Sequence, residues 1–258
     1  MPFFQPGPDP DFPFLGESDY FSFTEPKEWE DKVTIIDEYE TFYFRRREAG
    51  LDRNIIAIGG NLSPGMLLSA YEQGIFPWYN SSDPLIWQSP DPRFVIFAEK
   101  LHVSSSMRKI FKNRAFDITF NRDFTGVIKG CSEVFRPGQN GTWITCDIME
   151  GYAKLHSLGF AHSAEAWRDG ELAGGCYGVL LGRAFFGESM FARESNASKA
   201  AFLSLAEKLF EQGLLFIDCK TPTRHLGSLG GEEISRKDFL RLLKESGVTR
   251  SQVSVSLK

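Results

Sequence analysis

The sequence predicts an α+β fold with a largely antiparallel sheet, and three features of its second half carry the prediction. Residues 161–168 and 172–179 are strand-like segments joined at Asp169-Gly170, a dipeptide typical of tight hairpin turns. A half-buried helix follows between Asn196 and Gly213, because apolar residues recur in this segment at helical spacing. Residues 214–220 then form another strand. A hairpin followed by a helix and a further strand is typical of α+β proteins.

The first half begins with a segment rich in proline and phenylalanine. In residues 1–54 we expect an extended front segment that docks its aromatic side chains, since closely spaced prolines disfavour a helix. Ile55–Ile58 is then a short apolar strand. Ser63 is a suitable N-cap with Pro64 at the first helical position, so a helix begins here and stops at Gly74.

Residues 76–93 combine four prolines with four aromatic residues. This density of proline argues against regular structure, so we expect an ordered loop that carries function. A domain boundary is placed near Asp91, which divides the chain into an N-terminal domain, residues 1–92, and a second domain, residues 93–258.

The other elements of the second half follow from local signals. The helix after the hairpin is capped by Asn196 and ended by Gly213. The rest are the strands Phe94–Phe97, Phe116–Phe120 and Ala184–Gly187, a basic helix Ser104–Lys112, a helix from about Asp147 to Gly159, and a last helix at Arg236–Lys244.

Composition limits the possible functions. The chain has 258 residues and a net charge of −5, so RNA binding would require a local basic patch. The four cysteines lack C-x-x-C spacing and are expected to be reduced thiols. No apolar run is long enough to span a membrane, and the first ten residues lack the features of a signal peptide. A cytoplasmic monomer with no membrane partner is expected.

Familiar catalytic motifs are missing. The sequence contains no P-loop, no G-x-G-x-x-G opening a helix, no H-E-x-x-H and no G-x-S-x-G. Its four histidines have no metal-ligand spacing among themselves. We therefore expect chemistry that needs neither a metal nor a nucleotide cofactor.

Dense polar and aromatic loops remain, and together they are specific. They include Gly59-Gly60-Asn61-Leu62-Ser63-Pro64, Gly74-Ile75-Phe76-Pro77-Trp78, Ser89-Pro90-Asp91-Pro92-Arg93, Gly141-Thr142-Trp143-Ile144-Thr145, Gly187-Glu188-Ser189-Met190-Phe191, Asn196-Ala197-Ser198-Lys199 and Ser228-Leu229-Gly230. In order and approximate spacing these blocks closely resemble the leucyl/phenylalanyl-tRNA–protein transferase family over residues 55–245. The resemblance implies a small N-terminal domain followed by a domain related to the N-acetyltransferase superfamily.

The resemblance also implies an activity. The family transfers Leu or Phe, and less well Met, from aminoacyl-tRNA to proteins that begin with Arg or Lys, and the product is marked for degradation. An aminoacyl ester is already activated, so ATP is unnecessary. Holding the acceptor amine against the ester carbonyl, near a carboxylate that draws off a proton, would supply most of the rate. Two alternatives are an acetyl-CoA-dependent N-acyltransferase and an RNA-binding module that has lost transfer.

Asp218 is the first candidate for that carboxylate. Strand alternation puts Phe216, Asp218 and Lys220 on one face of an apolar strand. An Asp there needs either a hydrogen-bonding partner or a functional role, and the resemblance favours catalysis.

Lys220 stands where the family has Gln, and three roles are open. Its ammonium pairs with Asp218, or loses its proton and acts as a base, or repels an acceptor that begins with Arg or Lys. The first is favoured because a buried charge is usually paired.

The resemblance assigns substrate-binding roles as well. Glu188 would hold the acceptor's cationic first residue, Trp78 and Trp143 would stack on the terminal adenosine of tRNA, and an apolar pocket with Phe185 and Met190 would take the Leu or Phe side chain. The body of the tRNA would contact a basic cluster of Arg108, Lys109, Lys112 and Arg114.

Overall fold

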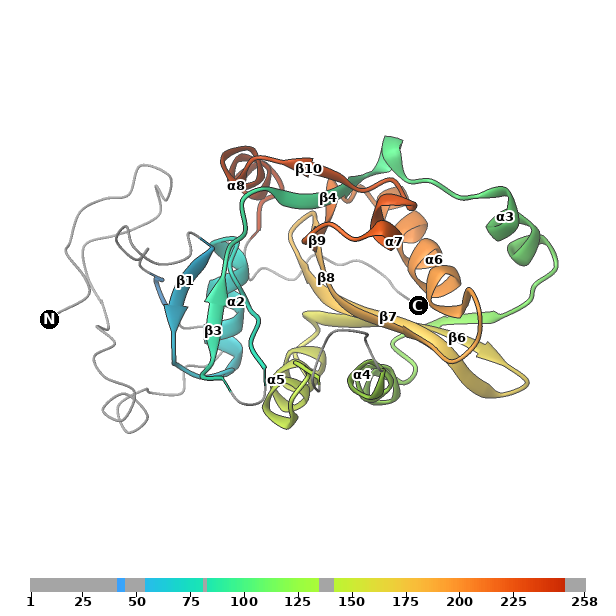
Figure 1. Ribbon diagram of the computed structural model, residues 1–258, viewed down its shortest axis with the longest axis horizontal. Helices are drawn as coiled ribbons and strands as arrows, with labels where there is room; N and C mark the ends of the chain where they lie inside the picture. Colours follow the sequence, from blue (N-terminus) through green and yellow to red (C-terminus); the bar gives the residue numbers. More distant parts are fainter. Residues whose placement is uncertain (1–40, 45–53, 81–82, 135–141, 249–258) are drawn as a thin grey trace, which may run out of the picture.

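The computed structural model describes residues 41–44, 54–80, 83–134 and 142–248. Figure 1 shows a small sheet at one end of the molecule and a large sheet with helices on both faces beside it. Most of the expected extended front segment, residues 1–54, lies outside the described residues. No helix in the described ranges is long and apolar enough to cross a membrane.

The small sheet has the order β1-β3-β2 and is antiparallel. Its strands are β1 (Ile55–Ile58), β2 (Phe76–Pro77) and β3 (Ile86–Gln88), and α2 (Pro64–Glu72) packs beside them. The expectation of an irregular loop over residues 76–93 is therefore wrong in part. A strand is possible because Pro77 lies in an edge strand, where its missing N–H interrupts no hydrogen-bond ladder.

The large sheet has seven strands in the order β10-β4-β9-β8-β7-β6-β5. Every neighbouring pair is antiparallel except β8 with β9. The strands are β4 (Arg93–Phe97), β5 (Asp117–Phe120), β6 (Ala161–Arg168), β7 (Glu171–Leu181), β8 (Ala184–Ala192), β9 (Phe216–Lys220) and β10 (Glu232–Ile234). The predicted α+β class with a largely antiparallel sheet is confirmed.

The hairpin that carried the prediction is β6–β7. Asp169 and Gly170 have φ values of 52° and 83°, so both turn residues are left-handed, as a two-residue turn that follows the strand twist requires. Beside it, β8 continues to Ala192, well past the predicted end at Gly187. The block Gly187–Phe191 is thus strand rather than loop, with a bulge at Glu188 that interrupts the alternation of its side chains.

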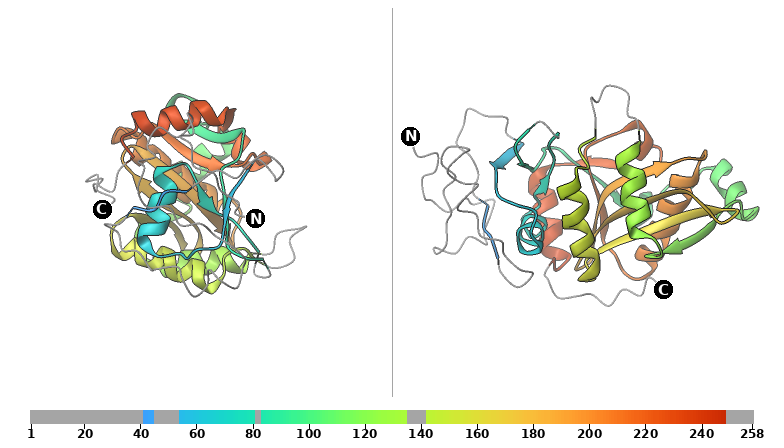
Figure 2. Two further views of the ribbon diagram at one scale, coloured as in Figure 1. Left: turned by 90° about the vertical axis from the view of Figure 1, so that its left-hand side faces the viewer. Right: turned by 90° about the horizontal axis from the view of Figure 1, so that it is seen from below.

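Helices cover the two faces of the large sheet with separate cores. On one face α4 (Phe124–Glu133) and α5 (Cys146–Ser157) lie side by side, as the right-hand view of Figure 2 shows. On the other lies α6 (Ala197–Glu211). Alternate residues of β7 enter the two cores: Tyr177 and Val179 pack with α4 and α5, and Cys176 and Leu180 pack with α6.

The sequence reading missed α4, which begins where Asp123 caps the N–H of Gly126. It also missed two short elements, α7 (Arg224–Gly227) and β10. The expected basic helix and last helix are confirmed as α3 (Ser105–Lys112) and α8 (Arg236–Glu245). One core joins the small sheet to the large one, since it includes Trp87 of β3 and Phe186 of β8. The division into domains of residues 1–92 and 93–258 stays a proposal.

Candidate active site

A cavity of about 410 Å³ lies where β8, the end of β9, α7 and the loop after β2 meet. Its volume is in the range of small-molecule sites. The lining includes six of the residues selected from the sequence: Trp78, Trp143, Phe185, Glu188, Met190 and Lys220. Segments far apart in the chain therefore converge on one site.

One wall of the cavity is apolar. Phe185 of β8 is 1% exposed and belongs to the core beneath α6. Met190 packs against the same core from further along β8, and Phe202 and Leu226 complete the wall. This wall has the chemistry that an aliphatic or aromatic side chain requires.

A buried polar network, which we call the carboxylate cluster, consists of Glu188 and Lys220, which line the cavity, and of Tyr71 and Tyr152 behind them. Lys220 donates from Nζ to Oε1 of Glu188 at 2.5 Å, and the Tyr71 hydroxyl donates to the same oxygen at 2.7 Å. The Tyr152 hydroxyl donates to Oε2 at 3.1 Å. The Glu188 side chain is 1% exposed, so its charge is balanced almost wholly by these partners.

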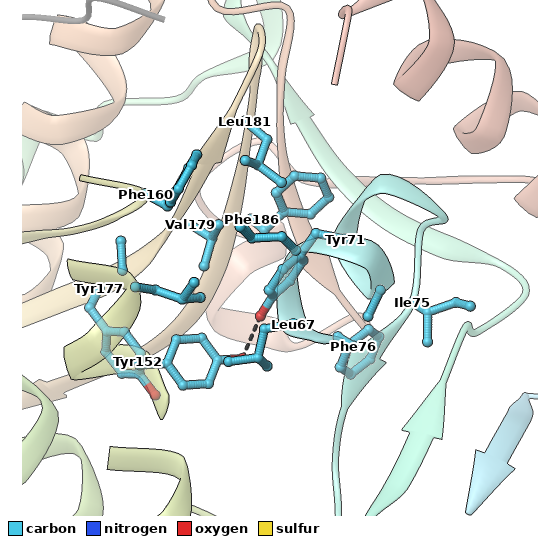
Figure 3. Packing of buried hydrophobic residues seen from close by; sticks show 14 of the residues in the cluster. Leu67, Tyr71, Ile75, Phe76, Tyr152, Phe160, Tyr177, Val179, Leu181 and Phe186 are labelled. Carbon is cyan, nitrogen blue, oxygen red and sulfur yellow. Dashed lines mark hydrogen bonds between the residues drawn. The ribbon is translucent and has the colours of Figure 1, made fainter. Parts of the chain in front are cut away.

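The two tyrosines hold the carboxylate from α2 and α5. The two hydroxyl oxygens also lie within hydrogen-bond distance of each other, so the two phenolic protons are shared among this contact and the two contacts with Glu188; Figure 3 shows the two rings pointing toward each other. Burial, followed by the charge of Glu188, raises the pKa of Tyr71 and Tyr152 well above the usual tyrosine value. Both hydroxyls therefore stay protonated and act as donors.

The pairing of Lys220 differs from the favoured prediction. Its ammonium binds Glu188, whereas only its backbone N–H reaches Asp218, at 2.9 Å from Oδ1. The reason is that both oxygens of Asp218 are already bound by Arg93 and by this N–H, so the ammonium, at the end of β9, binds the other buried carboxylate. The ammonium also lies over the rings of Phe76, 4.3 Å from its centroid, and Tyr71, at 5.2 Å.

Asp218 has a partner of its own. Arg93 of β4 binds it in bidentate fashion, with Nε to Oδ1 and Nη2 to Oδ2 both at 2.8 Å, and both side chains are 0% exposed. Arg93 also donates to the carbonyl of Gly74 at 3.1 Å. This ion pair lies behind the cavity and fixes the end of β9, from which Lys220 projects. A catalytic role for Asp218 stays a prediction.

Three members of this arrangement escaped sequence analysis: Arg93, Tyr71 and Tyr152. Arg93 closed one of the recognised sequence blocks, but nothing local indicated its partner 125 residues away. A further polar group, His225, lines the cavity. Its Nε2 is buried and has no hydrogen-bond partner among the described residues. Burial, and then the nearby charge of Lys199, lowers the pKa of His225, which favours the neutral ring.

The predicted tRNA-binding residues lie apart from the cavity. Arg108, Lys109, Lys112 and Arg114 are all exposed, on or just after α3 at the far end of the molecule from the small sheet. Ser104 caps this helix, and Arg108 donates to the Val103 carbonyl at 3.0 Å. Their role in binding tRNA stays a prediction. Within the described ranges, no group of His, Cys, Asp and Glu is arranged to hold a metal ion.

Comparison with known proteins gives a consistent result. The sequence model for the family described as leucyl/phenylalanyl-tRNA protein transferase matches residues 95–244, and that for its N-terminal domain matches residues 60–91. A leucyl/phenylalanyl-tRNA–protein transferase of Myxococcus xanthus is 52% identical over 189 residues, which are 73% of this chain and 81% of that protein. A protein of the same name from Saccharophagus degradans is 47% identical over 216 residues, 83% of this chain and 88% of that one.

Likeness to solved structures is weaker. The structure of L-PGS from Bacillus licheniformis has a TM-score of 0.38 and 14% identity, and covers 53% of this chain and 48% of its own. Similarity at this level carries no conclusion about function.

Proposed function

This chain belongs to the leucyl/phenylalanyl-tRNA–protein transferase family, and from this premise we propose that it moves Leu or Phe, and less well Met, from aminoacyl-tRNA to the N-terminal α-amine of proteins that begin with Arg or Lys. The product would carry an N-terminus that marks it for degradation. We place the enzyme in the cytoplasm as a monomer, where aminoacyl-tRNA is available.

The observation that supports this proposal is the cavity with one apolar wall and one buried carboxylate. The Leu or Phe side chain would pack against Phe185 and Met190, while Trp78 and Trp143 would stack on the terminal adenosine. These contacts would hold the ester carbonyl near Glu188. The acceptor would then enter with its α-amine toward the ester.

Transfer would need only one exchange of bonds. The α-amine nitrogen attacks the ester carbonyl, the new C–N bond forms, and the C–O bond to the ribose breaks. One amine proton leaves the nitrogen and one is gained by the released ribose oxygen. Because the ester is already activated, positioning and proton transfer account for the chemistry, and no cofactor takes part.

The proposal is tested by offering labelled Leu-tRNA and labelled acetyl-CoA side by side with a peptide that begins with Arg. We expect label from the tRNA in the peptide and none from acetyl-CoA. Acetylation without aminoacyl transfer would overturn the proposal.

Trp78 offers a direct test of donor binding. Its side chain is 37% exposed at the cavity, so truncation removes little core packing. Stacking on a base contributes about 1–3 kcal/mol. We expect Trp78→Ala to raise the KM for Leu-tRNA by about one order of magnitude and to leave the melting temperature unchanged. Loss of cooperative unfolding together with activity would instead assign Trp78 to the core.

The basic helix predicts a salt effect. If Arg108, Lys109 and Lys112 neutralise phosphates, changing all three to Ala should weaken binding of aminoacyl-tRNA. It should also flatten the plot of log affinity against log salt by about 0.7–0.9 for each phosphate that is no longer neutralised. Filter binding at several salt concentrations measures this slope. A slope equal to that of the parent would mean that these residues are solvent-exposed charges that do not contact tRNA.

A further inference from the structure

The carboxylate of Glu188 already holds a cation from its own chain. The Lys220 ammonium lies 2.5 Å from Oε1, and the two side chains are 10% and 1% exposed. The aromatic faces of Phe76 and Tyr71 add attraction for the same ammonium. The pair is therefore a desolvated, charge-assisted contact and not a solvent-exposed surface bridge.

This pair makes the cavity close to neutral. Among the described residues that line it, Glu188 is the one acidic side chain, and Lys220 is the one lysine or arginine. A cationic acceptor side chain that enters meets a carboxylate whose charge is already balanced. It must displace the Lys220 ammonium, or stay without a counter-ion in a partly dry site, which is unfavourable.

Displacement is hard because Lys220 is held at its backbone. Its N–H donates to Oδ1 of Asp218, and Asp218 is fixed by the buried Arg93. The ammonium thus competes as a tethered group, whereas the acceptor loses translational freedom when it binds. A cation that is tethered here therefore binds Glu188 more favourably than a cation that arrives from solution.

We propose that Lys220 is a specificity-determining residue, which occupies Glu188 in place of the acceptor's own cation. The enzyme then takes, besides the Arg and Lys acceptors of the proposed function, acceptors with an uncharged first side chain, and uses them about as well. This inference rests on the proposed function and concerns which acceptors the same cavity takes.

The test compares two peptides that differ only in charge. One begins with Arg and the other with citrulline, which has nearly the same shape but no charge. We expect the parent to use them with kcat/KM values within about threefold of each other. In Lys220→Gln, Glu188 is released, so the ratio of Arg to citrulline should rise by about tenfold or more, mainly through a lower KM for the Arg peptide.

Two further variants control the experiment. Lys220→Met removes the charge but keeps most of the apolar stem of the side chain, so it should also raise the ratio. If Lys220→Gln does not fold, this variant decides. Lys100→Gln removes the same charge from an exposed lysine that pairs with Glu232 outside the cavity, and it should leave the ratio unchanged.

The outcomes separate the inference from the proposed function. A parent that prefers Arg by about tenfold or more, with the same preference in both Lys220 variants, overturns the inference. So does loss of all transfer in folded Lys220 variants, because Lys220 would then act on the reaction itself. If the parent transfers nothing from Leu-tRNA, the proposed function fails. Equilibrium binding of the two peptides still decides the inference in that case, by the same ratio.

Discussion

Asp218→Asn is expected to lower the free energy of unfolding by one of the largest amounts that a single substitution can cause in this fold. The substitution leaves the Arg93 guanidinium buried without a counter-ion, opposite an amide. Breaking a buried pair in this way costs about 3–5 kcal/mol. That is a large part of the roughly 5–15 kcal/mol by which folded proteins are typically stable. Urea unfolding measures the decrease in the free energy of unfolding.

A double variant distinguishes the ion pair from a catalytic base. Removing both charges with Asp218→Asn and Arg93→Met should restore much of the stability, since no unpaired charge remains. If Asp218→Asn is instead as stable as the parent but cannot transfer Leu, the sequence-based prediction of a catalytic Asp218 is correct. The structure favours a positioning role, in which Asp218 orients the backbone of Lys220.

Gly187→Val is expected to have the largest effect on activity without loss of the fold. Gly187 lies beside Glu188 on β8 and lines the cavity. A Cβ there would meet only the Asp218 carbonyl, at 3.4 Å, which is an ordinary contact. The valine side chain would therefore enter space that the substrates need. We expect transfer to fall by about 100-fold or more, as it does when reacting groups are misplaced.

Gly227→Val is the matched control for this variant. Gly227 belongs to α7, is exposed and is not part of the cavity lining, and a Cβ there meets nothing within 4 Å. Transfer rates and melting temperatures of the two variants are compared. Full activity in Gly187→Val would mean that transfer takes place elsewhere.

Local signals predicted many of the regular elements of this fold but missed α4, α7 and β10. Asp169-Gly170 placed the β6–β7 hairpin, and helical spacing placed α6, because turn chemistry and periodicity are written in neighbouring residues. The same local reading failed for β8, where a Gly-Glu-Ser run looked like a loop. The strand conformation of this run depends on pairing with β7, which no short segment reveals.

The candidate site was predicted as a set of residues but not as a set of contacts. The family resemblance selected Trp78, Trp143, Glu188 and Lys220, and one cavity contains all four. Their partners come from distant segments: Tyr71 reaches Glu188 across 117 positions. The Lys220 pairing differs from the prediction because Arg93, 125 positions away, occupies both oxygens of Asp218, and no local pattern in the sequence reveals that contact.

This protein joins an amino acid from tRNA to the α-amine of an acceptor. The direct test of this reaction is single-turnover transfer with labelled Leu-tRNA, excess enzyme and a peptide that begins with Arg. The product is then sequenced by mass spectrometry. We expect a peptide extended by Leu ahead of its original first residue. A peptide that remains unextended while Leu-tRNA is bound, or that carries Leu on a side chain, would contradict it.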